Sequence, residues 1–273
     1  MFNKLPLKSK FTWKKSHTRS FFLGSMVCVL LMETSSVSAA ESPSIRFATG
    51  NDFAPFADEG LPSGGLATEI VNRIFGSAGY KVETVFLPWK RGHRSTLANK
   101  FDGTFPYYRT ASRIQKFVFS VPIFETQGRV YVAKNSNFEA NSIEEFAGLK
   151  LCRALGYSIP GLFRPLTREG RVEVVNVPKP LNSLRMVAKN RCDFVVWNSL
   201  VADVVAKKAK DKHYQLRPIQ FELAPSTTHL IVAKDHPDAE TLIRTFNRGM
   251  YLLRKSGDYS RIVEAHLSPS SQQ

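Results

Sequence analysis

The sequence predicts an α/β fold with two lobes, each built on a mostly parallel sheet flanked by helices. Short apolar runs typical of strands alternate with segments in which apolar residues recur every four positions, as they do on one face of a helix. This alternation begins again after residue 134, which indicates a second lobe. With 273 residues, 43% of them hydrophobic and 22% charged, the chain has enough apolar material for one large or two ordinary globular domains.

The first half opens with a strand at 45–50, which is followed by a helix at 65–80. In this helix Leu66, Ile70 and Ile74 recur at a spacing of four residues and mark the buried face. The remaining elements expected before residue 135 are a helix at 90–99 and strands at 81–87, 101–105, 117–120 and 128–134.

The second half opens with a helix start at 142–146, where Ser142 and Glu145 have the spacing of a capping box. A further helix at 180–190 carries its apolar residues on one face. The other expected elements are strands at 149–154, 172–177, 193–197, 214–221 and 228–234 and helices at 159–168, 199–209, 238–255 and 258–267.

The last strand and the last two helices exceed what the second half needs, so we expect them to cross back to the first half. The predicted boundaries are 44–129 plus 226–268 for lobe 1 and 130–225 for lobe 2, with 269–273 as a disordered tail. Two strand-like connections between the lobes would leave a cleft, and clefts at domain interfaces are where small ligands bind.

Residues 1–40 have the pattern of a secretory signal peptide. Six Lys or Arg residues precede an uncharged run at 21–32, and small residues lead to a cleavage site near Ala39 or Ala40. The uncharged run has twelve residues, whereas a membrane-spanning helix needs about 20. An uncleaved membrane anchor is the alternative interpretation.

The charge of the chain favours anionic ligands. Without residues 1–40, which hold six Lys or Arg and one Glu, the formal net charge falls from +15 to +10. No nucleic-acid-binding motif and no long basic run accompanies this charge, so nucleic acid is a poor partner for an exported chain. A general attraction of anionic ligands is the better use of the charge.

Two cysteines, Cys152 and Cys192, follow the export segment. In an oxidising compartment they could form a disulfide. Both lie near the beginnings of expected strands, and pairs on neighbouring strands often have poor bridging geometry. We therefore expect two buried thiols, with a disulfide as the alternative.

Ligands of open α/β sheets bind near the carboxyl ends of the strands. The segments that follow the expected strands are 51–56, 88–91, 105–113, 156–158 and 197–199. These segments hold candidate binding residues from both lobes without any reference to a known family.

Three side chains in these segments suit a small ligand. Trp89 and Trp197 fall at strand ends in different lobes, where their rings could stack on a flat or apolar ligand, although each could instead cap the core of its own lobe. Arg113 offers a fixed fork of donors that fits a carboxylate, although an Arg in a turn is commonly only solvated.

Motifs of common enzyme sites are absent from the sequence. It contains no G-x-S-x-G elbow, no Walker loop and no G-x-G-x-x-G. The histidines after residue 40 have no metal-ligand spacing, and no two carboxylates are paired as acid and base. We therefore expect no catalytic residues, no metal site and no cofactor.

Several motifs, taken in order, carry a resemblance to a known family. They are IRFATGNDFAPF at 45–56, GGLATEI at 64–70, LANKFDGTFPYYRTASR at 97–113, FVFSVPIF at 117–124, FAGLKLCRALGYS at 146–158 and NRCDFVVWN at 190–198. In this order the chain resembles the bacterial extracellular solute-binding proteins of family 3, which are periplasmic receptors for polar amino acids and related solutes. The resemblance covers residues 44–267 and implies a type II periplasmic-binding fold that closes on its ligand about a two-strand hinge. It also implies a periplasmic location, a monomer, and delivery of the solute to an ABC importer permease.

The resemblance assigns roles to three residues. Phe53 matches the aromatic residue that stacks on the ligand, and Arg113 matches the Arg of T-x-x-R that binds an α-carboxylate. Ser158 matches the hydroxyl residue of the second-lobe turn that also holds the carboxylate. Trp89, Pro106, Tyr108, Tyr157, Trp197 and Asn198 complete an expected site of nine residues. Which of Tyr107, Tyr108 and Tyr157 faces the cleft stays open.

The chain departs from the family pattern where an amino acid's α-amine would bind. Pro106 and Tyr108 stand where family members have small or hydroxyl residues, and Asn198 stands where they have an Asp that neutralises the amine. An ammonium group buried without a carboxylate partner is costly. We therefore expect an anionic ligand without a conventionally recognised α-amine.

Two other functions remain open. The same lobes could serve as a free-standing periplasmic sensor or binding protein without a transporter. They could also form an enzyme like the cyclohexadienyl dehydratases, but the second-lobe turn of those enzymes is GGTNE, and GYSIPG at 156–161 supplies no matching acid.

Overall fold

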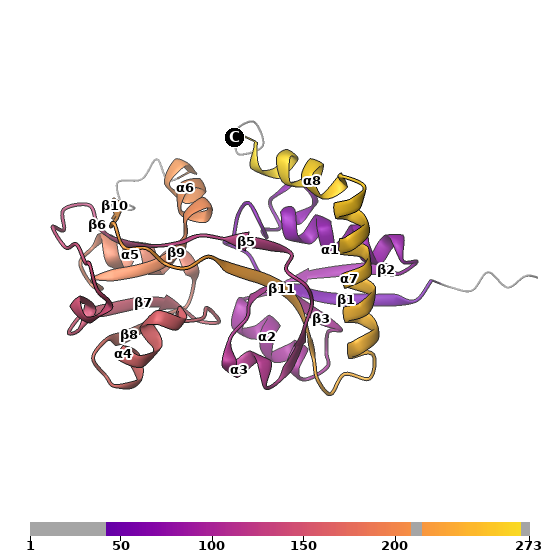
Figure 1. Cartoon of the computed structure of the whole chain (residues 1–273), viewed down its shortest axis with the longest axis horizontal. Helices are drawn as coiled ribbons and strands as arrows, with labels where there is room; N and C mark the ends of the chain where they lie inside the picture. The colour runs from indigo at the N-terminus through magenta and orange to yellow at the C-terminus, as the bar shows by residue number, and fades with distance from the viewer. Residues whose placement is uncertain (1–41, 209–214, 269–273) are drawn as a thin grey trace, which may run out of the picture. The chain divides into compact units, whose positions relative to one another are not determined.

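The computed structural model of the chain describes residues 42–208 and 215–268, whose strands form two sheets with helices packed against them (Figure 1). The predictions of a signal peptide at 1–40 and of a disordered tail at 269–273 concern residues outside these ranges. Within the described ranges, no helix is both long and apolar enough to cross a membrane.

The first sheet has the strand order β2-β1-β3-β11-β4, and β5 also pairs with β11. Strand β1 runs parallel to β2 and β3, whereas β11 runs antiparallel to β3, β4 and β5. The strands are β1 (Ser44–Thr49), β2 (Lys81–Phe86), β3 (Gly103–Tyr108), β4 (Phe117–Phe119), β5 (Phe124–Thr126) and β11 (Ser226–Ala233).

The second sheet has the order β10-β6-β9-β7-β8. Strand β7 is parallel to β8 and β9, and β6 is antiparallel to β9 and β10. The strands are β6 (Gly128–Ala133), β7 (Lys150–Ala154), β8 (Glu173–Val177), β9 (Phe194–Asn198) and β10 (Leu216–Pro218).

Both sheets are therefore mixed, and less parallel than the sequence predicts. The antiparallel neighbours arise where the chain passes between the sheets, at β5–β6 and at β10–β11 (Figure 1). Strands β6 and β11 are each reached from the other sheet, not through a helix from a strand of their own sheet. The rule that a βαβ unit has parallel strands therefore does not apply to them. The α/β class with two sheets is confirmed.

Helices pack against both sheets. The α-helices are α1 (Leu66–Ser77), α2 (Trp89–Leu97), α3 (Ala111–Ile114), α4 (Arg164–Arg168), α5 (Pro180–Ala188), α6 (Ser199–Lys208), α7 (Ala239–Lys255) and α8 (Asp258–Leu267). The short 3₁₀ turns are η1 (Pro62–Gly64), η2 (Ile143–Phe146) and η3 (Gly161–Phe163). The predicted helices at 142–146 and 159–168 are thus shorter than expected, being the turn η2 and the pair η3 and α4.

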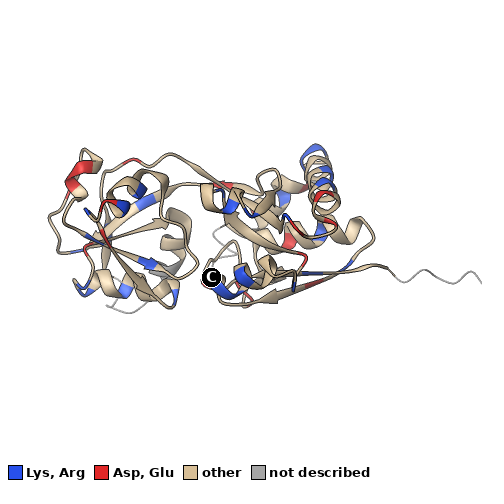
Figure 2. Ribbon diagram, turned by 90° about the horizontal axis from the view of Figure 1, so that it is seen from below, with Lys and Arg blue, Asp and Glu red and all other residues tan. Residues whose placement is uncertain are grey.

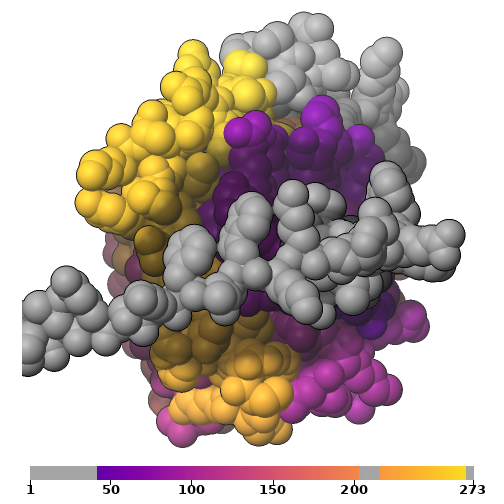
Figure 3. Space-filling view, turned by 90° about the vertical axis from the view of Figure 1, so that its right-hand side faces the viewer, coloured from indigo at the N-terminus to yellow at the C-terminus, as the bar shows by residue number. Residues whose placement is uncertain are grey.

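The C-terminal helices return to the first sheet. Helices α7 and α8 contact α1, and Figure 3 shows the yellow C-terminal segment beside the indigo N-terminal one. The approach is close at Gly249, where a Cβ would lie 2.4 Å from Cγ2 of Ile74. A glycine at this position lets the two helices pack without a steric clash.

Aromatic rings fill the centres of both cores. Around the first sheet Phe47 contacts Phe75 and Phe105 at ring-centroid distances of 4.8 and 6.0 Å. Around the second, Phe146 lies 5.0 Å from each of its neighbours Phe163, Phe194 and Phe221. Fully burying a Phe side chain contributes about 1.5–3 kcal/mol, so each ring cluster stabilises its own sheet and the helices on it.

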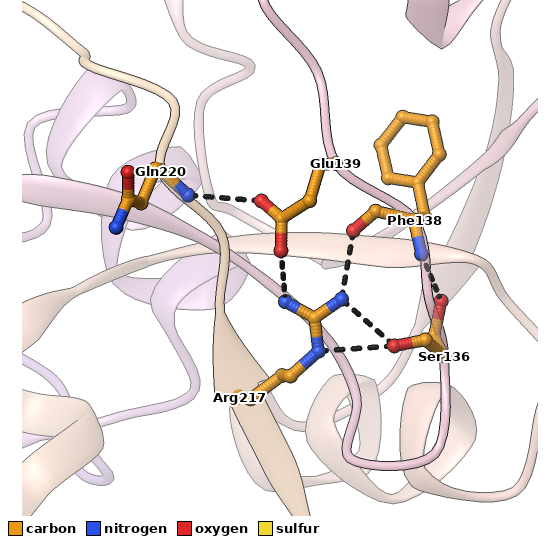
Figure 4. A network of polar contacts seen from close by, with 5 residues as sticks. All are labelled: Ser136, Phe138, Glu139, Arg217 and Gln220. Atoms are coloured by element: carbon orange, nitrogen blue, oxygen red, sulfur yellow. Dashed lines mark hydrogen bonds and ion pairs between the residues drawn. The ribbon is translucent and has the colours of Figure 1, made fainter.

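Arg217 on β10 secures the edge of the second sheet (Figure 4). Its guanidinium donates to the carbonyl oxygens of Ser136 and Phe138 and to the carboxylate of Glu139. The other Glu139 oxygen accepts from the backbone N–H of Gln220 at 3.2 Å. This network ties residues 136–139, which follow β6, to Arg217 in β10 and to Gln220 just after it. Lys and Arg are otherwise spread over the helices and loops around both sheets (Figure 2).

A disulfide joins Cys152 and Cys192, so the expectation of two buried thiols is wrong. Cys152 lies in β7, but Cys192 lies in the turn before β9 rather than in the strand. That turn is held against β7 by the hydrogen bond from the backbone N–H of Asp193 to the Lys150 carbonyl, at 3.0 Å. The two Cα atoms are 5.7 Å apart, within the usual range for a disulfide.

We expect loss of the disulfide to destabilise the protein. The bond closes a loop between positions 40 residues apart, and removing such a cross-link costs about 2–4 kcal/mol because the unfolded chain gains conformational freedom. Urea unfolding of the wild type and of the double variant Cys152→Ala, Cys192→Ala measures the difference. The wild type should lose this stability in reductant and the variant should not. Equal stability of the oxidised wild type and the variant would contradict the expectation.

Candidate functional site

A cavity of about 140 Å³ lies where residues of the two sheets and their loops meet. The residues on the first-sheet side include Phe53, Tyr108, Arg109, Thr110 and Thr126. Those on the second-sheet side include Tyr157, Ser158, Arg164, Trp197 and Asn198. The cavity is therefore built by segments that are far apart in the sequence.

A smaller cavity of about 30 Å³ adjoins it. Trp89, Pro106 and Arg113 line only this smaller space, whereas Phe53 and Tyr108 line both. Tyr157 and Ser158 are also shared. The structure thus brings all nine predicted ligand-binding residues together, although three of them stand outside the larger cavity.

Tyr107 and Tyr108 lie within β3, which continues to Tyr108, whereas the sequence predicts that this strand ends at residue 105. There they pair with His229 and Thr228 of β11, which the sequence places in the other half of the chain. The Tyr107 ring is 3% exposed and its hydroxyl donates to the Trp89 carbonyl at 2.9 Å. Tyr107 is therefore part of the core, and Tyr108 and Tyr157 line the larger cavity.

Tyr157 inserts its ring among aromatic side chains of the first-sheet side. Its centroid is 6.4 Å from Phe53 and 6.2 Å from Trp89, both in edge-to-face geometry. Trp89 in turn lies 5.9 Å from Phe53 and 5.7 Å from Tyr107. We call Phe53, Trp89 and Tyr107 the aromatic box. Such ring pairs contribute about 0.5–1.5 kcal/mol beyond their area burial.

Gly156 allows this insertion. Its φ of +93° lies in the left-handed region, and a Cβ would lie 2.7 Å from the Lys90 backbone nitrogen and 2.8 Å from the Trp89 Cβ. Only a residue without a side chain can make this turn so close to the start of α2. The loop 156–158 is thereby held against the first-sheet side.

The two tryptophans are mostly core residues. Trp89 is 7% exposed and donates through Nε1 to the Asn51 carbonyl at 2.9 Å. Trp197 is 4% exposed and lies in β9, opposite Arg129. Each tryptophan therefore packs in the core and also borders one of the cavities, which combines the two roles that the sequence leaves open.

Arg113 is buried and links the two sides of the site. Its Nη1 donates to the Tyr108 carbonyl at 2.9 Å, and its Nη2 donates to the Gly156 carbonyl at 3.0 Å. The guanidinium carbon lies 4.7 Å from the Tyr107 ring centroid. Burial lowers the pKa of Arg113 to about 10, which leaves the group cationic at neutral pH.

Thr110 positions Arg113 at the start of α3. The Thr110 hydroxyl accepts from the Arg113 backbone N–H at 3.3 Å, so the sequence T-A-S-R forms a capped helical turn. Arg109, next to it, is exposed and lies over the Phe119 ring at 5.2 Å. The two arginines of this segment therefore point in different directions, one inward and one outward.

Two buried polar groups at the larger cavity lack partners. Asn198 accepts from the Val201 backbone N–H at 3.1 Å through Oδ1, and its Nδ2 lies near the Tyr108 hydroxyl but forms no hydrogen bond of normal geometry with any described residue. The Tyr157 hydroxyl likewise has none. Burial raises the pKa of Tyr157 well above its usual value, so its hydroxyl stays protonated. An unsatisfied buried polar group costs about 1–3 kcal/mol, and a ligand with acceptor atoms would satisfy both.

The charged residues that line the two cavities are all cationic, although the Asp52 carboxylate lies close enough to help raise the pKa of Tyr157. Arg109 and Arg164 line the larger cavity and Arg113 lines the smaller. No Asp or Glu is among the lining residues that the structure describes. The site can therefore attract an anion, and it has no carboxylate to pair with an ammonium group.

The sequence prediction missed lining residues from the connecting strands. The Thr126 hydroxyl of β5 donates to the Ser226 carbonyl at 3.0 Å and shares a hydrogen bond with the Tyr108 hydroxyl at 3.2 Å. Thr126 and Ser226 both line the larger cavity. Neither residue lies in a segment that follows one of the expected strands, so the rule that ligands bind at strand ends does not predict them. The expected connections between the lobes are the only feature of the sequence that points to them. No group of three or more His, Cys, Asp or Glu side chains in the described ranges could hold a metal ion.

Comparison with solved structures identifies the fold. The substrate-binding protein AbpA of an amino acid ABC transporter from Streptococcus pneumoniae, bound to L-arginine, is 19% identical, with a TM-score of 0.67 over 84% of this chain and 95% of that chain. A histidine kinase sensor domain with similarity to periplasmic binding proteins is 21% identical, with a TM-score of 0.70 over 84% and 97%. An ancestral amino acid-binding protein described as a precursor of cyclohexadienyl dehydratase is 21% identical, with a TM-score of 0.65 over 82% and 96%. At these identities the likeness shows the fold alone.

No curated protein matches the sequence. The family described as bacterial extracellular solute-binding proteins, family 3, matches residues 45–269. This range spans both sheets, the aromatic box and all nine predicted site residues, and it agrees with the resemblance seen in the motifs. The chain therefore belongs to the bacterial extracellular solute-binding proteins of family 3.

Proposed function

We propose that the protein captures a small anionic solute, such as a carboxylate, in the larger cavity, and that it does not recognise a free α-amine. The observation that carries this proposal is the pairing of two unsatisfied buried groups, Asn198 Nδ2 and the Tyr157 hydroxyl, with a lining that contains no Asp or Glu. Both groups can donate to the oxygen atoms of an anion.

The cations around the cavity support an anionic ligand. Arg109 and Arg164 border the cavity, and Arg113 stands behind Tyr108 with three further N–H donors besides the two already bonded. A carboxylate that enters this space gains charge-assisted hydrogen bonds. An ammonium group would enter a positive, carboxylate-free site, and its desolvation would go uncompensated.

The apolar walls support a ligand with a ring or an aliphatic body. Phe53, Tyr108 and Trp197 face the same space as the polar groups. Flat apolar surfaces with a few fixed donors are the usual composition of a small-molecule site. The proposed site comprises both cavities. Six of the nine expected residues line the larger one (Phe53, Tyr108, Tyr157, Ser158, Trp197 and Asn198), and Trp89, Pro106 and Arg113 line the smaller one.

The organisation proposed around the site follows the family. Lobe 1 comprises 44–129 plus 226–268 and lobe 2 comprises 130–225, with the connecting strands as the hinge. We infer that residues 1–40 are a signal peptide cleaved near Ala39 or Ala40, which exports a monomer to the periplasm. The proposed partner is an ABC importer permease, as AbpA belongs to an ABC transporter.

A sensory role is the second candidate, since a histidine kinase sensor domain shares the fold. In that case the same cavity would bind the solute without delivering it to a permease. Catalysis is a weaker candidate. The likeness to a dehydratase precursor shows a shared fold, but among the described residues no carboxylate lines the cavities to act as an acid or base.

A panel of solutes tests the proposal. We expect mono- and dicarboxylates without an amine to raise the Tm, because a ligand that binds only the folded protein stabilises it by mass action. Standard L-amino acids, tested at the same concentrations, should not. Thermal shift followed by calorimetry measures both sets. Micromolar binding of Lys, Arg, His or Gln would overturn the proposal, and consumption of a bound compound would favour catalysis.

Replacing Asn198 by Asp reverses the charge preference. Asn198→Asp keeps the side-chain oxygen that accepts from Val201, but it exchanges the unsatisfied Nδ2 donor for a carboxylate oxygen. We expect affinity for an anionic solute to fall about tenfold or more, which is about 1.4 kcal/mol, while amine-bearing solutes gain affinity. Calorimetry on both classes measures the change. Unchanged anion binding would contradict the proposed role of Asn198.

Replacing Arg113 by Lys separates charge from geometry. Arg113→Lys keeps the positive charge but loses the planar fork that spans the Tyr108 and Gly156 carbonyls. We expect anion affinity to fall about tenfold, measured well below the Tm of the variant. The exposed Arg248→Lys serves as the matched control and should bind like wild type. An affinity equal to that of the control would remove Arg113 from the proposed site.

A further inference from the structure

An open groove of about 900 Å³ runs beside the two cavities and is lined by cations from both sheets' sides. Lys90 and Lys116 come from the first-sheet side, at α2 and just after α3. Arg153, Arg164 and Arg168 come from β7 and α4 of the other side. No Asp or Glu is among its described lining residues. Helices α2, α3 and α4 lie at the lower edge of Figure 1, and Figure 2 views the molecule from that side.

These cations have no counterions within the described part of the chain. The guanidinium of Arg153 donates to the neutral Asn176 Oδ1 at 3.0 and 2.6 Å, and Arg164 donates to the Ile159 carbonyl at 3.2 Å. No ion pair of a described residue involves Lys90, Lys116 or Arg168. Several arginines elsewhere on the surface do have a carboxylate partner.

Arg46, Arg171 and Arg217 each pair with a Glu. These three arginines are neutralised by carboxylates, whereas the groove cations have no carboxylate partner among the described residues. One-signed charge in a concave surface raises the local concentration of counterions. His93, which also lines the groove, does not add to the charge, because burial and the nearby Arg113 and Lys116 lower its pKa to about 4.

The placement of the cations on both sides has a mechanical consequence. Lys90 and Lys116 face Arg153 and Arg168 across one groove, so like charges repel when the two sides approach. An anion of a single charge can neutralise only one of them. An oxyanion with several charged groups can contact both sides at once and convert the repulsion into attraction.

We propose that this groove is a second binding site, for a multivalent oxyanion carrying several phosphate or carboxylate groups, which bridges Lys90 and Lys116 on one side and Arg153 and Arg168 on the other. The site is distinct from the cavity that holds Asn198, although Tyr157, Ser158 and Arg164 line both. Arg113 lines the groove and the smaller cavity. Its occupancy stabilises the arrangement in which loop 156–158 contacts the first-sheet side.

Calorimetry with tripolyphosphate and with citrate, at 150 mM salt on the full mature chain, tests the site. At this ionic strength the screening length is about 8 Å, which suppresses diffuse attraction but not contact in a groove. We expect saturable binding of at least one of the two probes, and the stronger one identifies phosphate or carboxylate as the preferred group. No saturable binding of either probe overturns the proposal.

Two paired variants test the bridge. Arg153→Gln with Arg168→Gln, and separately Lys90→Gln with Lys116→Gln, should each weaken probe binding about tenfold or more. The double variant Arg129→Gln with Arg248→Gln removes the same charge from exposed positions outside the groove and should change binding less than twofold. Equal losses in all three variants, or a loss confined to one side of the groove, would overturn the bridging site.

The two proposed sites can be told apart. Asn198→Asp should weaken capture of a monocarboxylate in the cavity about tenfold or more and leave probe binding in the groove intact. The Arg153→Gln, Arg168→Gln variant should do the reverse. A Tm within a few degrees of wild type shows that each variant folds. If Asn198→Asp removes tripolyphosphate binding as well, the groove is not a separate site.

Discussion

The hydrogen bond from Arg113 Nη2 to the Gly156 carbonyl is the contact on which the site depends. It joins the capped turn at α3 to the loop that follows β7, and it fixes where Tyr157 enters the aromatic box. Arg113 is buried and cationic, so leaving its donors unpaired would be costly. The carbonyls of Tyr108 and Gly156 accept two of these hydrogen bonds. Arg113 also lines the smaller cavity and the groove, and its guanidinium lies over the Tyr107 ring of the aromatic box.

The family and the fold class could be predicted from the sequence because they depend on patterns of many residues. Alternating strand and helix periodicity, and motifs spaced over the whole chain, survive small local errors. Predictions for single elements were weaker. The sequence predicts a strand at 101–105, whereas β3 continues to Tyr108 because Tyr107 and Tyr108 pair with β11. Long-range pairing of this kind has no local signal.

The candidate site shows the same division. Residues at the ends of parallel strands, such as Phe53 and Tyr157, could be proposed from topology, whereas Thr126 and Ser226 sit on connecting strands that the rule does not cover. The sequence does not predict the disulfide, because it places Cys192 near a strand but does not show the turn that brings its Cα atom to 5.7 Å from that of Cys152. Nor could the sequence show that the carbonyls of Tyr108 and Gly156 occupy donors of Arg113.

Shared fold also leaves function open, since a substrate-binding protein, a kinase sensor domain and a dehydratase precursor have this architecture.

The insertion of Tyr157 into the aromatic box means that any solute which needs the box competes with a side chain of the protein itself. Its apparent dissociation constant equals the intrinsic one divided by the fraction of molecules in which Tyr157 lies outside the box. Every ring contact that Tyr157 makes with Phe53 and Trp89 lowers that fraction. The threshold concentration for capture is thus set in part by an intramolecular competitor, the Tyr157 ring.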